Sequence, residues 1–288
     1  MNENARRVLT LTLSCPDRVG IVAAVSTLIA RKHGWIVEAN HHSDPLSGRF
    51  FMRNVIIADS LADGVEDFRR EFASIAAQFH MDWSVADSAV KKRVVLLVSR
   101  LDHCLYDLLH RWKSGEYDIE IPCVISNHTD LRADVESRGL DYIHIPATAA
   151  NRDAACARIA EIFEQRRGDV LVLARYMQIL TPAMCARYPA RIINIHHGFL
   201  PSFSGARPYH QALERGVKLI GATCHYVTPE LDEGPIIEQD VIRIDHTDTV
   251  EDLIRYGRDI ERRVLAQGLK YHLEDRVLLD GRKTVVMR

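Results

Sequence analysis

The stretch Arg93-Val94-Val95-Leu96-Leu97-Val98-Ser99 is an almost uninterrupted run of apolar residues in a chain of 288 residues. A parallel strand that helices cover on both faces has this composition. Further strand-like segments follow at residues 119–126, 142–145, 170–174, 192–195, 221–227 and 236–241. Helix-like segments separate them at residues 102–113, 131–138, 152–165 and 182–186, and a long one follows at 250–272. This alternation predicts an α/β domain over residues 93–288, with a doubly wound, mostly parallel, Rossmann-like sheet.

Residues 7–87 have a different order of elements. Strand-like alternation at 8–13, 35–40, 50–57 and 80–85 is combined with helical spacing of apolar residues at 19–30 and 66–79. The order βαββαβ is typical of a ferredoxin-like domain. Residues 88–92 form a short, largely polar segment, which we expect to link the two domains.

The composition excludes several classes of partner. Charged residues make up 26% of the chain and the net charge is −2. A net charge this small gives no electrostatic reason to expect nucleic acid or an anionic membrane as a partner. No apolar run approaches the roughly 20 residues that span a bilayer. The six cysteines are scattered without a CxxC pair, and the N-terminus lacks the apolar core of a signal peptide, so we expect reduced thiols and a cytoplasmic location.

The groups best suited to chemistry are Asn194, His196 and Asp232. Residues i and i+2 of a strand project to the same face, so Asn194 and His196 point together while Ile195 enters the core. In a sheet of this class, ligands bind beyond the carboxyl ends of the strands. An amide can hydrogen-bond a developing oxyanion, an imidazole can shuttle a proton, and a carboxylate can orient its neighbour. The three residues therefore suit attack on a carbonyl carbon.

Plainer interpretations exist for each residue taken singly. Any one of the three could instead tie down a loop, because most buried polar groups are structural, but together at strand ends they favour a site. His196 and His197 are adjacent on a strand and point to opposite faces, so we expect no metal there. Pro201 suits a tight turn and allows a cis peptide bond. Residues 205–210 resemble a helix start, where Arg207 would meet an anion or the helix would simply be capped.

Two motifs resemble those of a known family. Asn194-Ile195-His196-His197-Gly198-Phe199-Leu200-Pro201-Ser202-Phe203 is similar to the NIHxSxLPxF signature of formyltetrahydrofolate-dependent formyltransferases. Leu231-Asp232-Glu233-Gly234-Pro235-Ile236-Ile237 is similar to their LDxGPII signature. The doubled histidine, with Asp102-His103-Cys104-Leu105-Tyr106-Asp107-Leu108-Leu109 and Ser126-Asn127-His128, narrows the resemblance to formyltetrahydrofolate deformylases. Gly198 departs from the pattern, because the family usually has serine there.

By this resemblance Asn194, His196 and Asp232 are the catalytic residues, and 10-formyltetrahydrofolate is the substrate. Asp232 positions a water that attacks the formyl carbon, and Asn194 and a neutral or protonated His196 stabilise the oxyanion. Formate and tetrahydrofolate then leave, and no cofactor is expected. The resemblance also implies that two segments bind the folate, namely Tyr176, Met177, Gln178, Ile179, Leu180, Thr228, Pro229, Glu230 and Leu231. The first segment offers apolar contacts for a flat heterocycle, although without the resemblance ordinary packing at a helix entry explains it better.

The first domain resembles an ACT domain, which is a ferredoxin-like regulatory module. Residues 15–22 look like its ligand loop, so we expect Asp17, Arg18, Gly20 and Ile21 to bind an amino-acid effector, with glycine and methionine as the candidates. Such domains often pair across subunits, which implies a homo-oligomer, either a dimer or a tetramer. The implied role is that of a hydrolase in one-carbon metabolism that serves purine biosynthesis.

Two other functions remain open from the sequence. A formyltransferase that passes the formyl group to glycinamide ribonucleotide needs the same three residues, and typically a glycine-rich loop after the first strand for the acceptor's phosphate. Here that loop is Ser99-Arg100-Leu101-Asp102-His103-Cys104, which has no glycine, so water is favoured as the acceptor. The second alternative is a non-catalytic sensor of folate or amino acids, which the presence of all three polar groups disfavours.

Overall fold

The computed structural model describes residues 6–202 and 208–288, so Arg207 of the expected anion-binding helix start lies outside the described residues. The chain divides into two compact units, of which one runs to Lys91 and also includes Tyr271–Arg288, while the other is Lys92–Lys270. The sequence predicted a second domain that continued to residue 288. In the structure the final segment packs with the first unit instead.

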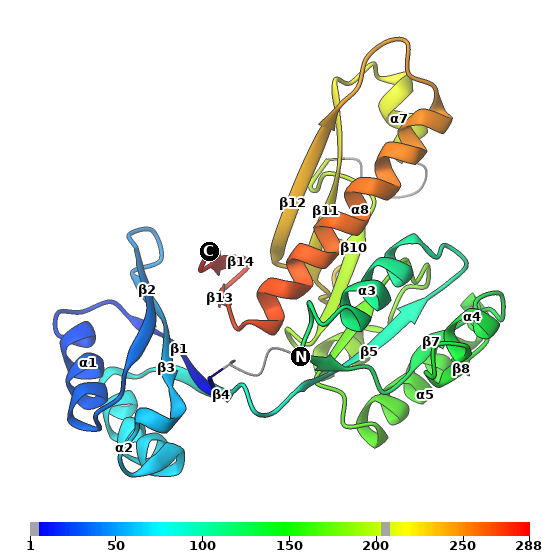
Figure 1. The fold of residues 1–288 in the computed structure, drawn as a ribbon. Helices are drawn as coiled ribbons and strands as arrows, with labels where there is room; N and C mark the ends of the chain where they lie inside the picture. Colours follow the sequence, from blue (N-terminus) through cyan, green and yellow to red (C-terminus); the bar gives the residue numbers. More distant parts are fainter. Residues whose placement is uncertain (1–5, 203–207) are drawn as a thin grey trace. The chain divides into compact units, whose positions relative to one another are not determined.

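The first unit is built on a four-stranded antiparallel sheet in the order β2-β3-β1-β4 (Figure 1). Its elements are β1 (Val8–Pro16), α1 (Ile21–Arg31), β2 (Ile36–Asp44), β3 (Arg49–Ile57), a short 3-10 helix (Ala58–Ser60), α2 (Gly64–Phe79) and β4 (Asp82–Asp87). This is the predicted βαββαβ order. Alternate residues of β1, such as Leu11 and Leu13, pack with Phe68 and Phe72 of α2 in one core, as the period-two pattern requires.

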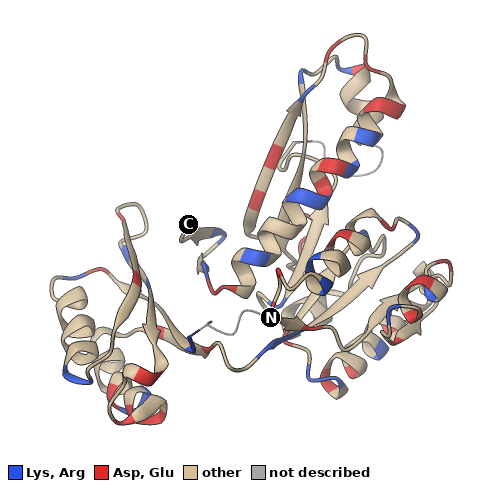
Figure 2. Cartoon of the chain, in the orientation of Figure 1, with Lys and Arg blue, Asp and Glu red and all other residues tan. Residues whose placement is uncertain are grey.

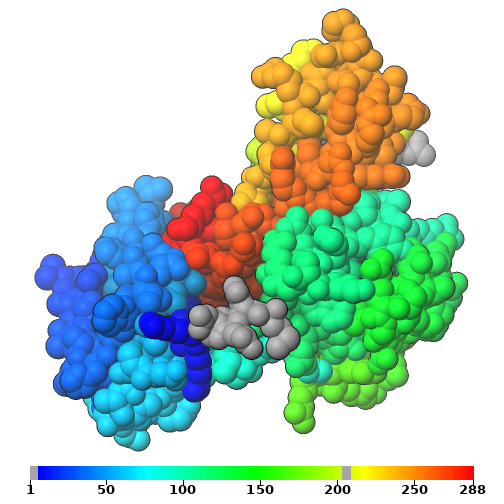
Figure 3. All heavy atoms as spheres, viewed as in Figure 1, coloured from blue at the N-terminus to red at the C-terminus, as the bar shows by residue number. Residues whose placement is uncertain are grey.

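A C-terminal hairpin covers the other face of this sheet. It consists of β13 (Val277–Asp280) and β14 (Lys283–Val286). Phe50 packs in the core with the helices, so its neighbour Phe51 points to the opposite face, where it is buried with Leu278. Figure 3 shows the C-terminal segment, in red, against the first unit, in blue. Arg53 lies on that same face and donates hydrogen bonds of 3.1 and 2.9 Å to the backbone oxygen of Glu274. These contacts explain why the final segment belongs to the first unit.

The second unit contains an eight-stranded sheet whose main path is β12-β11-β10-β9-β5-β7-β8, with β6 beside β5. Its elements are β5 (Lys92–Val98), α3 (His103–Lys113), β6 (Ile119–Glu120), β7 (Val124–Ser126), α4 (Arg132–Glu136), β8 (Tyr142–His144), a 3-10 helix (Ala149–Asn151), α5 (Arg152–Gln165), β9 (Val170–Leu173), α6 (Pro182–Arg187), β10 (Ile192–His196), α7 (Pro208–Glu214), β11 (Leu219–Tyr226), β12 (Ile236–Arg243) and α8 (Val250–Leu273). Strands β5 to β10 run parallel, and β11 and β12 are antiparallel additions at one edge. The predicted mostly parallel α/β sheet is confirmed.

One predicted strand is divided in the structure. The sequence predicted a single strand over residues 119–126, whereas the structure has β6 and β7 with a gap between them. Pro122 lies in that gap. Proline has no backbone N–H to donate to a neighbouring strand, so the ladder is interrupted there.

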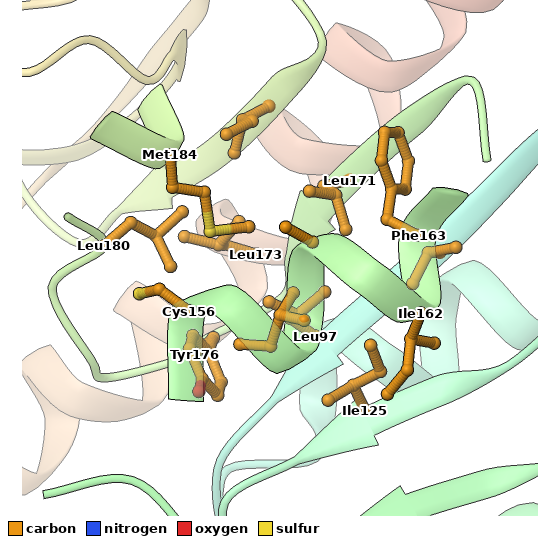
Figure 4. Close-up of a cluster of buried hydrophobic side chains, with 14 of the residues drawn as sticks. Leu97, Ile125, Cys156, Ile162, Phe163, Leu171, Leu173, Tyr176, Leu180 and Met184 are labelled. Carbon is orange, nitrogen blue, oxygen red and sulfur yellow. The ribbon is translucent and has the colours of Figure 1, made fainter. Parts of the chain in front are cut away.

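Helices cover both faces of this sheet. Val95 and Leu97 of β5 pack against residues of α5 and α6 in one buried cluster (Figure 4). The alternate residues Val94 and Leu96 are also buried and face the other side, where α3 and α8 lie (Figure 1). Burial on both faces explains why the run that begins at Arg93 is almost wholly apolar.

Charged residues of both signs are mixed along the part of the chain that the structure describes (Figure 2). Figure 2 shows acidic and basic residues interspersed along the helices of both units. Among the described residues, no helix combines the length and the apolar character that crossing a membrane requires.

Candidate active site

Strand β10 presents Asn194 and His196 on one face of the sheet. Asn194 pairs in register with Leu173, the last residue of β9, so it lies level with the end of its parallel neighbour. His196 is the last residue of β10, and Ile195 between them is buried. The two side chains therefore project together at the carboxyl edge of the parallel strands.

The loop between β11 and β12 brings Asp232 to His196. Asp232 Oδ2 lies 3.3 Å from His196 Nδ1. The loop closes tightly on β11, because Tyr226 N donates to Pro235 O at 2.9 Å. A Cβ atom at Gly234 would lie 1.7 Å from Tyr226 O, so only glycine fits this turn. The Gly234-Pro235 pair thus sets the position of Asp232.

The histidine and the aspartate form a close polar pair. The hydrogen bond with His196 lowers the pKa of Asp232 below its ordinary value, against the effect of burial, so the carboxylate is ionised at neutral pH. His196 is 5% exposed. Its Nδ1 faces the carboxylate, and its Nε2 has no hydrogen-bond partner among the residues that the structure describes. That nitrogen is therefore available to a substrate.

His225 is a further member of the site, and the sequence-based prediction missed it. It lies opposite Asn194 in the antiparallel pair of β10 and β11 and is 2% exposed. His225 Nδ1 lies 2.9 Å from Tyr226 O, which can only accept, so Nε2 is left to accept a hydrogen bond from Asn194 Nδ2 at 3.2 Å. Burial lowers the pKa of His225 and so keeps the ring neutral. Strand alternation alone placed His225 on one face of β11, but its register with β10 was needed to find it.

A buried threonine holds the segment that follows β10. Thr223 Oγ1 donates to Gly198 O at 2.9 Å and accepts from Leu200 N at 3.0 Å. Gln239 Nε2 donates to Thr223 Oγ1 and to Leu200 O, at 2.9 Å each. The Leu200–Pro201 peptide bond is cis, which the sequence allowed. Gly198 thus contributes its backbone oxygen to the network that shapes this side of the site.

The expected folate segment after β9 contains two kinds of residue. Tyr176 and Leu180 are buried in the core with α5 and α6 (Figure 4), so for them the packing interpretation holds. Met177 and Ile179 are 52% and 49% exposed. Ser99 anchors the segment, because Met177 N donates to Ser99 Oγ at 3.0 Å.

The second expected folate segment directly precedes Asp232. Pro229 and Glu230 are exposed, and Thr228 Oγ1 donates to Glu230 O at 3.1 Å. Leu231 is 61% exposed. The segment thus offers an apolar side chain and backbone groups beside the carboxylate.

The expected effector loop of the first unit is largely exposed. Asp17, Arg18 and Gly20 lie in the turn between β1 and α1, and Asp17 N donates to Gly48 O at 2.9 Å. Gly20 has a φ of 98°, a left-handed conformation that favours glycine. Ile21 differs from the other three, because its side chain is buried in the core beneath α1 and α2 and serves packing.

Comparisons with known proteins agree with this architecture. The formyl transferase family model matches residues 92–269. A formyltetrahydrofolate deformylase of Corynebacterium sp. (strain P-1) is 46% identical over the whole of both chains, and that of Bacillus subtilis (strain 168) is 48% identical over 99% of this chain and 94% of its own. The crystal structure of a formyltetrahydrofolate deformylase from Pseudomonas syringae pv. tomato is 57% identical and covers 100% of this chain and 96% of that one, with a TM-score of 0.97. Glycinamide ribonucleotide transformylase 1 from Symbiobacterium toebii is 33% identical over 69% of this chain and 95% of its own, with a TM-score of 0.65.

Proposed function

The chain belongs to the formyltetrahydrofolate deformylase family, and we propose on this premise that Asn194, His196 and Asp232 are its catalytic residues. The reaction is the hydrolysis of 10-formyltetrahydrofolate to formate and tetrahydrofolate. The observation that carries the proposal is the contact of His196 with the ionised Asp232, at the strand end that also presents Asn194. An oriented imidazole, a charged carboxylate and an amide donor thus meet at one place.

Asp232 handles the proton of the attacking water. Its Oδ2 faces His196 Nδ1, and its Oδ1 lies 3.9 Å from His225 Nε2. As the water oxygen forms a bond to the formyl carbon, the ionised carboxylate accepts a water proton. The electron pair of the formyl C=O bond moves onto its oxygen and produces a tetrahedral oxyanion.

Asn194 and His196 stabilise that oxyanion. Asn194 Nδ2 carries two N–H groups, of which one is donated to His225, so the second is available to the substrate. His196, whose Nδ1 faces Asp232, presents Nε2 to the same oxyanion. The intermediate then collapses, the bond from the carbon to N10 breaks, and N10 receives the proton. One well-placed donor of this kind lowers the barrier by roughly 3 kcal/mol.

The exposed apolar residues support a folate site beside these three groups. Met177 and Ile179 follow β9, and Leu231 precedes Asp232. A flat heterocycle is stabilised when it covers such side chains and removes them from water. Residues 228–231 add backbone donors and acceptors for the edge of the ring, while Tyr176 and Leu180 anchor the first segment in the core.

The activity is tested by incubating the purified chain with 10-formyltetrahydrofolate, with and without glycinamide ribonucleotide. Release of formate at the same rate in both reactions supports hydrolysis. Strict dependence on the acceptor would overturn it in favour of transfer. Transfer is the less favoured alternative, because the deformylases match the whole chain whereas the transformylase matches only part of it.

For the first unit we propose a regulatory role. The exposed turn with Asp17, Arg18 and Gly20 supports binding of a small amino acid, glycine or methionine, and the edge strand β2 supports pairing of subunits. Titration calorimetry that detects no heat with either amino acid would leave only the assembly role. The six cysteines are free and buried, which supports a reducing, cytoplasmic location.

A further inference from the structure

A second cluster of buried polar groups adjoins the candidate active site, and the proposed mechanism does not use it. Its centre is Glu261 on α8, which is 1% exposed. His103 Nε2 lies 2.8 Å from Glu261 Oε2, and Arg175 Nε lies 3.3 Å from the same oxygen. Tyr209 OH donates to Glu261 Oε1 at 2.8 Å. We call these four residues the Glu261 cluster.

The surrounding chain makes room for the Glu261 cluster. Gly257 lies one turn before Glu261, and a Cβ there would lie 2.0 Å from Tyr209 OH, so a larger residue would push the tyrosine off the carboxylate. Burial raises the pKa of Glu261, but the hydrogen bond from His103 and the charge of Arg175 outweigh it and hold the pKa below its usual value. The carboxylate is therefore ionised, and both its oxygens have partners within the protein.

His197 connects the Glu261 cluster to the catalytic residues. Its ring centroid lies 5.3 Å from that of His196 and 6.2 Å from that of Tyr209. Burial, followed by the positive charge of Arg175, lowers the pKa of His197 to about 4, so the ring is neutral at neutral pH. His197, one residue beyond the catalytic histidine, thus lies between His196 and Tyr209 of the cluster.

The Glu261 cluster lies on the other side of the strand end from Asp232. Ile192 packs against α5 and α6, and His196 shares its face because strand residues alternate. His197 continues the alternation toward the opposite face. There α8 packs directly on the sheet, since a Cβ at Gly268 would lie 2.4 Å from Cys224 Sγ. Tyr176 and Leu180, which anchor the first proposed folate segment, pack on the first face, so the Glu261 cluster lies on the face opposite this segment.

This position is where a doubly wound sheet usually binds an anion. Phosphate groups commonly sit where the first strand ends and the next helix begins. Here β5 is followed by α3, whose N-cap residue is the acidic Asp102 and whose first residue is His103. His103 Nε2 is hydrogen-bonded to the buried carboxylate of Glu261, so this ring nitrogen is not free for a phosphorylated acceptor.

We propose that the Glu261 cluster selects the nucleophile: it keeps amine acceptors from the formyl carbon and leaves water to attack. This inference rests on the proposed hydrolysis. An amine acceptor needs room beside the formyl carbon and a partner for its charge. The one buried carboxylate of the cluster is already bound to Tyr209, His103 and Arg175. Water needs neither, because it is small and Asp232 positions it.

A metal site at the same place is disfavoured. His103, Cys104 and Glu261 place potential ligand atoms within 4.8 Å of one another. The guanidinium of Arg175 already neutralises Glu261, and a divalent ion would bring positive charge beside it. Burial also raises the pKa of the Cys104 thiol well above its usual value, which disfavours the thiolate that metals bind.

The test measures two products of one reaction. The full chain, its His103→Ala variant and the matched control His110→Ala, which changes an exposed histidine of the same helix, are each incubated with 10-formyltetrahydrofolate and excess glycinamide. Formate and N-formylglycinamide are quantified by mass spectrometry. In His103→Ala we expect the amine nitrogen to attack the formyl carbon. The new C–N bond forms, the bond from the carbon to N10 breaks, and the amine proton passes to N10.

We expect His103→Ala to raise the ratio of formylated amine to formate by about tenfold or more, the scale on which a change of pocket shape alters selectivity. The wild-type chain and His110→Ala should give formate alone, and His103→Gln, which keeps a donor for Glu261, should restore the wild-type ratio. If thermal unfolding shows that His103→Ala is not folded, Tyr209→Phe is assessed by the same ratio. A folded variant that yields formate alone, or that loses both products, would overturn the inference. Failure of the proposed hydrolysis gives a different result, because then the wild-type chain itself releases no formate.

Discussion

The catalytic residues and the Glu261 cluster are neighbouring groups of buried polar side chains that differ in which atoms lack a hydrogen-bond partner. Beside the ionised Asp232, His196 keeps Nε2 without a partner among the described residues. In the Glu261 cluster both oxygens of the carboxylate have hydrogen-bond partners, whereas His103 Nδ1 and the Nε and Nη1 atoms of Arg175 have none among the residues that the structure describes. The acid of the cluster is thus fully bound by the protein, while the catalytic histidine keeps a ring nitrogen for substrate.

The largest effect is expected from removing the unused donors. His196→Ala or Asn194→Ala should lower kcat about a hundredfold, because each deletes one donor to the oxyanion, worth roughly 3 kcal/mol. Steady-state formate release measures this effect. His110→Ala, which changes an exposed residue of α3 outside the proposed site, should retain most of kcat and serves as the control. Near-wild-type kcat in both alanine variants would rule out the assignment.

A pH-dependent effect is expected at His197, which lies between the two regions. Its pKa is lowered to about 4 in the folded chain, whereas an unfolded histidine titrates near about 6.5. Between these values the unfolded chain binds a proton that the folded chain does not, so stability falls as the pH drops from about 6.5 to about 4.

Replacement by glutamine should remove this dependence. The free energy of unfolding, measured by urea titration, should decrease over that pH range in both proteins. We expect the decrease to be smaller in His197→Gln than in the wild type by up to about 3 kcal/mol. His110→Gln, at an exposed site, should keep the wild-type slope. Equal slopes for the wild type and His197→Gln would show that this histidine is not the one that titrates.

A smaller effect is expected from displacing Asp232 without deleting it. In Gly234→Ala the new methyl group overlaps Tyr226 O, so the loop must shift at a cost of roughly 1–3 kcal/mol. Both the melting temperature and kcat should fall. Gly216→Ala has no atom within 4 Å of its new Cβ and should leave kcat unchanged, although its left-handed φ costs roughly 1 kcal/mol. An unchanged kcat in folded Gly234→Ala would show that the position of this loop does not affect the reaction.

The smallest effect is expected at His225, which orients Asn194 without touching substrate. His225→Leu should lower kcat about tenfold, with KM little changed, because the amide loses its acceptor and rotates. His225→Gln supplies an oxygen near the position of Nε2 and should recover part of the rate. If leucine and glutamine variants are equally slow, the hydrogen bond is not what matters.

Much of the fold could be predicted from the sequence because its cues are local. The apolar run at β5 and the alternating helices indicate a doubly wound sheet, and the period-two segments before residue 87 indicate βαββαβ. The placement of Tyr271–Arg288 could not be predicted, because Phe51 on β3 and Leu278 are distant in sequence and meet only in the folded first unit. Likewise the sequence does not distinguish Glu261 from the other charged residues of a long helix. Only the structure shows that His103, Arg175 and Tyr209 surround it.

For the candidate site, the sequence by itself determined that Asn194 and His196 share a face, since alternation along a strand is a property of the backbone. Only the tertiary structure decided that β11 pairs with β10 so that His225 meets Asn194, and that α8 brings a charged Glu261 beside the same strand end. Register and helix packing depend on contacts between residues far apart in the chain. These contacts stabilise the protein only when folding has brought the distant segments together.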